Sequence, residues 1–414
     1  MTALTVDSLE AGQERRDLWF TRWYYLLWFG GAAFHFPFLT LFYLHIGLTG
    51  AEIGWIGSMG AIVTLITAPF WASRSENWNN PRAMLQLFLI ISAVTFFLLS
   101  QQVAFLGIAL ITVFRAFMTS SLYPLSDAMA LRITKAVHAG FGSVRVFGSL
   151  GWVVFVPMAG WLVERLGLSF SLIGAGVLTA LSALMLFFIS RNHFSIDREK
   201  IKAVPRPNLR AIFPRLIDQP MLLGLALMIV IIGFGNSGVW AFQMTYLNQL
   251  GAPASLIGVV GMFSAVVELP FMFMADYLMK RYSAYRLLLI GMLLYMCLRL
   301  MVFLFPSVPT IMVEQAMNGI GFTFYTIGIV RFISDQTGNE SETRMLLAFF
   351  TVTLVSLTSI VSGPVAGSLF DQFGPHMLYG IAALGYFLAW VSLYIAGHYQ
   401  AKAKLAAESD PIHP

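Results

Sequence analysis

The chain has 414 residues, of which 58% are hydrophobic and 11% are charged. A soluble globular protein is roughly 45–50% apolar and about 25% charged, so this composition excludes that class. The net charge of +5 does not indicate nucleic-acid binding, because the basic residues lie between long apolar runs and there report orientation in a membrane. The single cysteine, Cys297, excludes an intrachain disulfide.

The unbroken apolar runs predict an all-α polytopic membrane protein. Every backbone polar group in a bilayer must be hydrogen-bonded within the protein, which leaves helices or a closed barrel. The runs lack the alternating segments of about ten residues that form barrel strands. A spanning helix needs about 20 apolar residues. With that length we predict twelve transmembrane helices, at 19–43, 53–73, 83–100, 104–130, 140–163, 169–190, 219–247, 255–275, 285–305, 308–332, 344–369 and 376–397.

The basic residues support this map. Of the 25 Lys and Arg residues, only Arg115, Arg165 and Arg299 fall within the membrane or on its outer side. The others lie in the tails, in the connectors after even-numbered helices or at the borders of those helices. This positive-inside pattern predicts a multi-pass protein of the cytoplasmic (inner or plasma) membrane with both termini in the cytoplasm. Residues 1–18 are too acidic for a signal peptide, and we expect them, like 398–414, to be cytoplasmic tails.

The longest connector, 191–218, is basic and contains prolines, and it divides the helices into bundles at 19–190 and 219–397. The two halves repeat, because P-M-A-G-W-L-V-E-R-L-G at 157–167 recurs as P-V-A-G-S-L-F-D-Q-F-G at 364–374. Two six-helix halves of the same topology resemble the major facilitator transporters. That architecture implies that substrate is handled near the bilayer midplane between the halves.

The stretch 124–152 carries the most informative side chains. Asp127 lies near the end of the fourth predicted helix, and Arg145 and Trp152 lie near the start of the fifth. An arginine fork suits carboxylate, phosphate or vicinal hydroxyls, and an indole can stack on a sugar or aromatic ring. These side chains therefore form either a polar-ligand site or a structural salt bridge at the membrane rim with a lipid-facing tryptophan.

This stretch resembles the bacterial lactose permease and its relatives. An acid is followed eighteen residues later by the arginine of F-G-x-x-R-x-F-G-x-x-G-W. The matching residues here are Pro124, Asp127, Phe141, Gly142, Arg145, Phe147, Gly148, Gly151 and Trp152. The resemblance implies that Asp127 and Arg145 bind sugar hydroxyls and that Trp152 stacks on the sugar ring.

Phenylpropionate permeases are similar as well. They share P-L-x-D-A and G-x-V-R-x-x-G-S in the same region. They extend the match to I-G-L-T at 46–49, Glu268, Arg299 and Gln315. We include Gln315 among the candidates for coupling or gating.

The tenth predicted helix departs from the lactose permease pattern. Lactose permease-like proteins carry there a histidine and a glutamate for proton coupling, and the corresponding positions here are Asn318 and Gly321. The seventh helix offers Asn236 and Gln243 but no acid. We therefore expect a different coupling residue, and we place Gln243 and Asn318 among the candidates for substrate binding.

Other intramembrane charges supply the alternatives, because an ionisable side chain in a bilayer is costly and marks function by default. We expect Glu268, in the middle of the eighth helix, to carry the proton, because a desolvated carboxylate can bind one near neutral pH. Arg299 and Glu314 lie at a similar depth and form either a gate or a static pair. The segment M-A-D-Y-L-M-K-R resembles the facilitator gating loop, which makes Asp276 a further candidate.

Arg115 lies near the middle of the fourth helix, twelve residues before Asp127 and about 120° from it around a continuous helix. If Arg115 faces the cavity, as we expect, a substrate carboxylate or phosphate is its partner. If it faces another helix, it caps carbonyl groups near a kink. We expect His35 to bond to a helix carbonyl rather than to line the cavity. An interfacial aromatic belt is predicted from Trp19, Trp23, Tyr24, Tyr25 and Trp28.

These observations predict a secondary active transporter that moves a sugar, a nucleoside or an aromatic or organic acid by alternating access, in symport with protons. The alternative is an efflux antiporter for drugs or organic anions, and a non-transporting receptor or scaffold comes third. The sequence shows no nucleophile–base pair, phosphate loop or metal-ligand cluster, so we expect neither an enzyme nor a cofactor beyond the proton gradient. The expected partners are the small-molecule substrate, protons and the lipid bilayer, and the expected state is a monomer.

Overall fold

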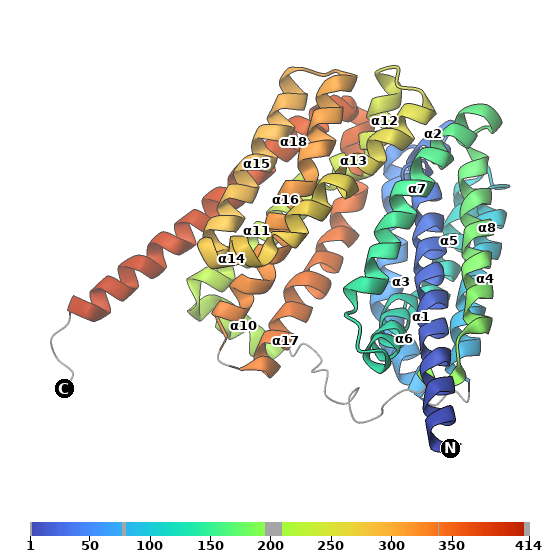
Figure 1. The fold of residues 1–414 in the computed structure, drawn as a ribbon. Helices are drawn as coiled ribbons and strands as arrows, with labels where there is room; N and C mark the ends of the chain where they lie inside the picture. Colours follow the sequence, from blue (N-terminus) through green and yellow to red (C-terminus); the bar gives the residue numbers. More distant parts are fainter. Residues whose placement is uncertain (1, 77–79, 195–208, 338, 410–414) are drawn as a thin grey trace. The chain divides into compact units, whose positions relative to one another are not determined.

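The computed structural model describes residues 2–76, 80–194, 209–337 and 339–409, which form helices without any strand (Figure 1). Within these residues, 11 segments are long and apolar enough to span a membrane. The last of them, Glu342–Lys402, contains two helices merged across a kink at Gly374, where φ is 73°. Counting these two separately recovers twelve spans, so the predicted all-α polytopic membrane fold is confirmed.

The first half of the chain supplies six spans, of which the first and the fourth are each made of two helices. Its elements are α1 (Thr2–His35), α2 (Leu39–His45), α3 (Gly50–Glu76), α4 (Pro81–Leu99), α5 (Phe105–Thr119), α6 (Leu122–Ala136), α7 (Gly142–Leu166), α8 (Ser169–Met185), and the 3-10 turns η1 (Leu186–Phe188) and η2 (Arg191–Phe194).

The second half begins with a short helix before its own six spans. Its elements are α10 (Leu209–Asp218), α11 (Pro220–Gly235), α12 (Ser237–Gln249), α13 (Ala254–Phe273), α14 (Ala275–Arg281), α15 (Ala284–Leu304), α16 (Val308–Asp335), α17 (Glu340–Ala348), the π-helical turn η3 (Phe349–Thr353) and α18 (Leu354–Ser409).

The described residues divide into two compact units. Unit 1 comprises the residues up to 194 together with 247–265, and unit 2 comprises 209–246 and the residues from 266 onward. The division passes through the end of α12 and through α13, whose first part packs with unit 1 and whose last part packs with unit 2. The segment 247–265, which the sequence analysis assigned to the second bundle, thus packs within the first unit.

In unit 1, α1 packs along both α7 and α8 (Figure 1). Gly151 on α7 permits the close approach to α1, because a Cβ added there would overlap the carbonyl oxygen of Leu26. The backbones of the two helices are therefore in contact beside the F-G-x-x-G-W segment. Small residues allow such close packing in lipid, where helices gain little from hydrophobic burial against one another.

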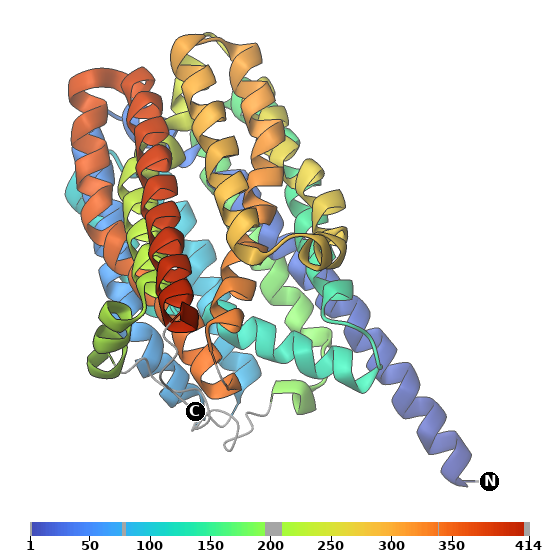
Figure 2. The same ribbon diagram turned by 90° about the vertical axis from the view of Figure 1, so that its left-hand side faces the viewer.

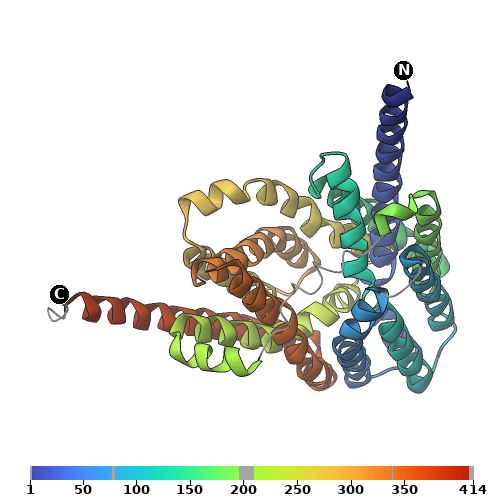
Figure 3. The ribbon, with the colours of Figure 1, turned by 90° about the horizontal axis from the view of Figure 1, so that it is seen from below.

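In unit 2, α11 lies beside α18, and α15 packs against α16 and α18 (Figure 2). Gly235 on α11 and Gly385 on α18 face each other, because a Cβ added to either would lie 3.0 Å from the Cα of the other. The C-terminal end of α18 continues beyond the other helices of its unit (Figure 3). A buried apolar cluster of residues from these helices forms the core of the unit.

Three spans are interrupted near candidate residues. The first breaks at 36–38, where Pro37 lacks the N–H group that a continuous helix needs, the fourth breaks after Thr119, and the seventh breaks at Asn236. Interrupted helices are tolerated in a membrane only where their freed backbone groups are buried in protein or line a cavity. The breaks therefore mark positions where polar side chains from neighbouring helices are expected.

The aromatic residues of α1 do not form the predicted belt. Tyr24 and Tyr25 are 0% exposed and Trp28 is 8% exposed, whereas Trp19 and Trp23 are about half exposed. Because α1 packs on two neighbouring helices, its inward aromatic residues belong to the core of unit 1. The prediction was wrong for these three residues, and one of them, Tyr25, contacts a candidate site residue.

Candidate functional site

Asp127 is held by a tyrosine of α1. The Tyr25 hydroxyl donates a hydrogen bond of 2.6 Å to Asp127 Oδ1, and the neighbouring Tyr24 hydroxyl lies 2.6 Å from Ser126 Oγ. Two successive residues of α1 thus meet two successive residues of α6. Tyr25 is buried, whereas Asp127 is only half-buried. A buried phenol hydroxyl therefore orients a carboxylate that remains partly accessible.

Arg145 lies on the other side of the same aromatic group. Its guanidinium carbon is 4.2 Å from the centre of the Phe29 ring, and Phe29 stacks on Tyr25 with a centroid distance of 6.0 Å. Arg145 is exposed, and within the described residues no ion pair joins it to Asp127. The arrangement is therefore not the structural salt bridge that the sequence left open. Both charged groups keep hydrogen-bonding capacity for a ligand.

Trp152 lies on α7, seven residues beyond Arg145, and is half-buried within unit 1. Its indole N–H donates a hydrogen bond of 3.0 Å to the carbonyl oxygen of Gly261, and its ring lies 6.1 Å from that of Phe36. A Cβ added at Gly258 would lie 2.6 Å from the carbonyl oxygen of Val156, so α7 and the first part of α13 are in close contact here. Trp152 thus contacts protein through both its indole N–H and its ring.

Arg115 and His35 form a different group. The Arg115 guanidinium carbon lies 4.7 Å from the centre of the Phe96 ring of α4, and the His35 ring lies 4.6 Å from that same ring. His35 bonds through Nδ1 to the carbonyl oxygen of Gly31 at 3.0 Å, as expected from the sequence. Arg115 lies on α5 and Asp127 on α6, on opposite sides of the break after Thr119, and the two residues have different contacts.

The candidate charges of unit 2 form one buried network. Arg299 on α15 makes an ion pair with Glu314 on α16, and these residues are 3% and 0% exposed. Arg299 Nε donates a hydrogen bond of 3.1 Å to Asn236 Oδ1 at the break in the seventh span. Gln243 of α12 donates to the second oxygen of Glu314. Three spans of the unit are joined here by hydrogen bonds between charged and polar groups.

The remaining candidates are more dispersed. Glu268 is half-buried on the part of α13 that belongs to unit 2. Gln315 is buried and accepts a hydrogen bond of 3.4 Å from Asn318, whose carbonyl oxygen accepts one from Tyr295. Asp276 lies in α14, but its side chain is outside the described part of the structure. No group of three His, Cys, Asp or Glu residues that could hold a metal occurs among the described residues.

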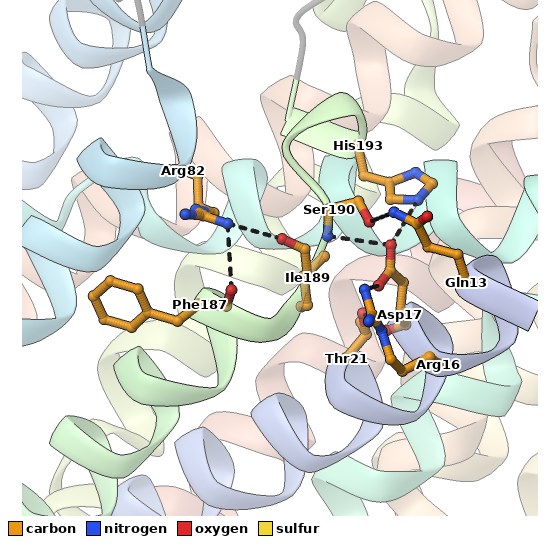
Figure 4. A network of polar contacts seen from close by, with 9 residues as sticks. All are labelled: Gln13, Arg16, Asp17, Thr21, Arg82, Phe187, Ile189, Ser190 and His193. Carbon is orange, nitrogen blue, oxygen red and sulfur yellow. Dashed lines mark hydrogen bonds and ion pairs between the residues drawn. The ribbon is translucent and has the colours of Figure 1, made fainter. Parts of the chain in front are cut away.

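A further polar network, which the sequence analysis did not identify, ties the middle of α1, around Asp17, to the residues that follow the sixth span (Figure 4). Asp17 is 0% exposed, and its Oδ2 accepts a 3.1 Å hydrogen bond from the Ser190 N–H and lies 3.3 Å from His193 Nε2. Arg82 donates hydrogen bonds to the carbonyl oxygens of Phe187 and Ile189 nearby. An acid directly before an apolar run was the available signal for this contact.

Comparison with known proteins bears on the whole chain. The model of the MFS_1 like family matches residues 18–392. The chain is 27% identical over 286 residues to the maltose permease of Geobacillus stearothermophilus, covering 68% of this chain and 70% of that protein. It is 25% identical over 371 residues to the probable 3-phenylpropionic acid transporter of Escherichia coli (strain K12), covering 88% and 94%.

A solved structure shares the fold. The crystal structure of the nucleoside transporter NupG superposes with a TM-score of 0.74 at 15% sequence identity, covering 93% of this chain and 98% of that chain. Identity at this level shows the fold alone and does not carry over the ligand.

Proposed function

Because the chain belongs to the MFS_1 like family and is a multi-pass membrane transporter of the major facilitator type, we propose that it is a secondary active transporter working by alternating access. Its substrate is a small polar molecule that carries a ring, of the sugar, nucleoside or aromatic-acid class. We place it in the cytoplasmic membrane as a monomer with both termini in the cytoplasm, as the distribution of basic residues indicates.

The observation that carries this proposal is the Asp127–Tyr25–Phe29–Arg145 arrangement. It offers an acceptor and a fork of donors on either side of an aromatic stack. Asp127 and Arg145 would bind hydroxyl or carboxylate groups of the substrate, and aromatic faces would cover its ring. The names of the relatives, a maltose permease and a probable 3-phenylpropionic acid transporter, include both chemistries.

Proton symport is the proposed mode of coupling. Glu314 is already paired with Arg299, so its charge is offset within the protein. Glu268 is half-buried in α13, a helix shared between the two units, and we propose that it carries the proton. In this scheme the Arg299–Glu314 pair maintains the geometry of unit 2 and responds to movements of the seventh span at Asn236.

The substrate class is tested by binding to purified protein. Maltose, a nucleoside and 3-phenylpropionate are screened by thermal shift, followed by uptake of the stabilising compound into proteoliposomes. Arg145→Lys keeps the charge and removes the planar fork, so we expect binding to weaken by about 1.5–3 kcal/mol, the range of a charge-assisted hydrogen bond. Arg165→Gln, at an exposed arginine of the same helix, is the matched control. Equal binding by the Arg145→Lys variant and the control variant would contradict the assigned site.

Proton coupling is tested by the pH change of the medium on substrate addition and by accumulation of substrate against its gradient. Addition of substrate to a lightly buffered cell suspension should alkalinise the medium if protons enter with substrate. Glu268→Gln should exchange substrate across the membrane but should not accumulate it against a gradient. Retained accumulation would remove Glu268 as the proton carrier, and acidification of the medium would favour substrate–proton antiport, as in an efflux pump.

A further inference from the structure

Arg115 is a cation inside a spanning segment whose described surroundings contain no counter-charge. Arginine stays protonated in proteins, and intramembrane charges are almost always paired because an isolated one is costly. Within the described residues, no carboxylate lies within ion-pairing distance of Arg115, and its close contact is the Phe96 ring at 4.7 Å. A ring face attracts a cation, but it does not neutralise the charge.

Other polar groups converge on the same place. Tyr43, a buried residue of α2, lies within electrostatic range of Arg115. The Thr112 hydroxyl, one helical turn before Arg115, is buried and interacts with the Tyr43 hydroxyl. A guanidinium and two hydroxyl groups therefore supply donors, while the neighbouring His35 supplies no negative charge.

The corresponding helices of unit 2 show an intramembrane arginine that is paired with a carboxylate. There the first, third and fourth spans of the half contribute Asn236, Arg299 and Glu314, and the arginine has its carboxylate. In unit 1 the first, third and fourth spans contribute His35, Phe96 and Arg115, and among the described residues no carboxylate forms an ion pair with this arginine. These clusters lie on corresponding spans of the two halves, and within the described residues the cluster in unit 2 contains a carboxylate whereas the cluster in unit 1 does not.

We propose that Arg115, Tyr43 and Thr112 form a binding site for a small monovalent anion, either a halide or the carboxylate of an organic acid. The site is distinct from the Asp127 site, because Arg115 lies on α5 against Phe96, whereas Asp127 lies on α6 and is bonded to Tyr25. Arg115 and His35 are half-buried rather than enclosed, so an anion has access to the group. The proposed anion site does not depend on which substrate binds at Asp127.

The experiment measures thermal unfolding of the purified full-length protein at constant ionic strength. The starting salt is the sodium salt of a bulky sulfonate buffer, which is replaced stepwise by chloride in one series and by acetate in another. We expect a saturable rise in the unfolding temperature, and the two series distinguish a halide site from a carboxylate site. The Arg115→Gln variant should lose the saturable rise, and Arg165→Gln, an exposed arginine, should retain it.

Two results would overturn the proposal. One is a rise that is equal in the Arg115→Gln and Arg165→Gln variants, which would indicate a general salt effect. The other is no saturable rise in the unsubstituted protein with either anion. Should Arg115→Gln fail to fold, Thr112→Val keeps the shape of the side chain and removes its hydroxyl. That variant should fold and require at least about tenfold more anion for the same rise, and an unchanged requirement would also contradict the site.

Discussion

The ion pair between Arg299 and Glu314 permits a quantitative test of how unit 2 is held together. Glu314→Gln keeps the size of the side chain but leaves the guanidinium of Arg299, 3% exposed, without its counter-charge. Removing one partner of a buried pair costs about 3–5 kcal/mol, because the remaining charge stays desolvated. We expect a loss of that size in the free energy of unfolding, measured by denaturant titration in mixed micelles. Replacing both residues with apolar ones should cost less than Glu314→Gln alone.

The same helix supplies the control. Arg331 and Asp335 form an exposed pair one turn apart on α16, with an N–O distance of 3.0 Å and side chains that are 56% and 44% exposed. Such pairs contribute about 0.3–0.5 kcal/mol, so Asp335→Asn should change stability by no more than that. If Glu314→Gln and Asp335→Asn destabilise equally, or if the double apolar variant loses as much as the sum of the single variants, the buried-pair argument is refuted.

Three further outcomes follow from unit 1. Tyr25→Phe removes the hydroxyl that orients Asp127 and should lower substrate affinity by about 1.5–3 kcal/mol in a binding titration, whereas unchanged affinity would remove Tyr25 from the site. Gly151→Ala should lower the free energy of unfolding by about 1–3 kcal/mol, because the added Cβ overlaps the backbone of α1. In the same assay Gly57→Ala, which has open space, should change stability by less than about 1 kcal/mol or increase it. Trp152→Phe keeps a ring and loses the hydrogen bond to α13, so stability should fall by about 0.5–1.5 kcal/mol, and no change would show that this bond contributes nothing.

The sequence was sufficient for the spans and for part of the site. Hydropathy identifies spanning helices because a bilayer accepts only long apolar runs whose backbone bonds are internal, and the twelve predicted spans match the structure. The motif around Asp127 and Arg145 was also visible, since its residues are close in the chain. Arg299 and Glu314 were recognised as possible partners, because charges at equal depth on adjacent helices can meet.

The side of each helix that packs against its neighbours could be determined only from the tertiary structure. The angle of about 120° between Arg115 and Asp127 was derived for a continuous helix, but the fourth span is broken after Thr119, so a helical wheel does not carry across the break. The structure places the Arg115 guanidinium over the Phe96 ring of α4, and that Arg115 also faces a cavity stays a prediction. A break in a span changes the rotation of the helix that follows it. The size of that rotation depends on the helices that pack against the break.

The partner of Asp127 is the second feature that local sequence could not reveal. Tyr25 precedes Asp127 by 102 residues, and a run of aromatic residues at the start of a spanning helix is typical of a membrane interface. The structure buries Tyr25 because α1 is packed between other helices of unit 1. Composition and charge thus determined that this chain spans a membrane and which residues are costly there. Only the packing of helices far apart in the chain decided which of those residues meet, because that depends on contacts that no single segment encodes.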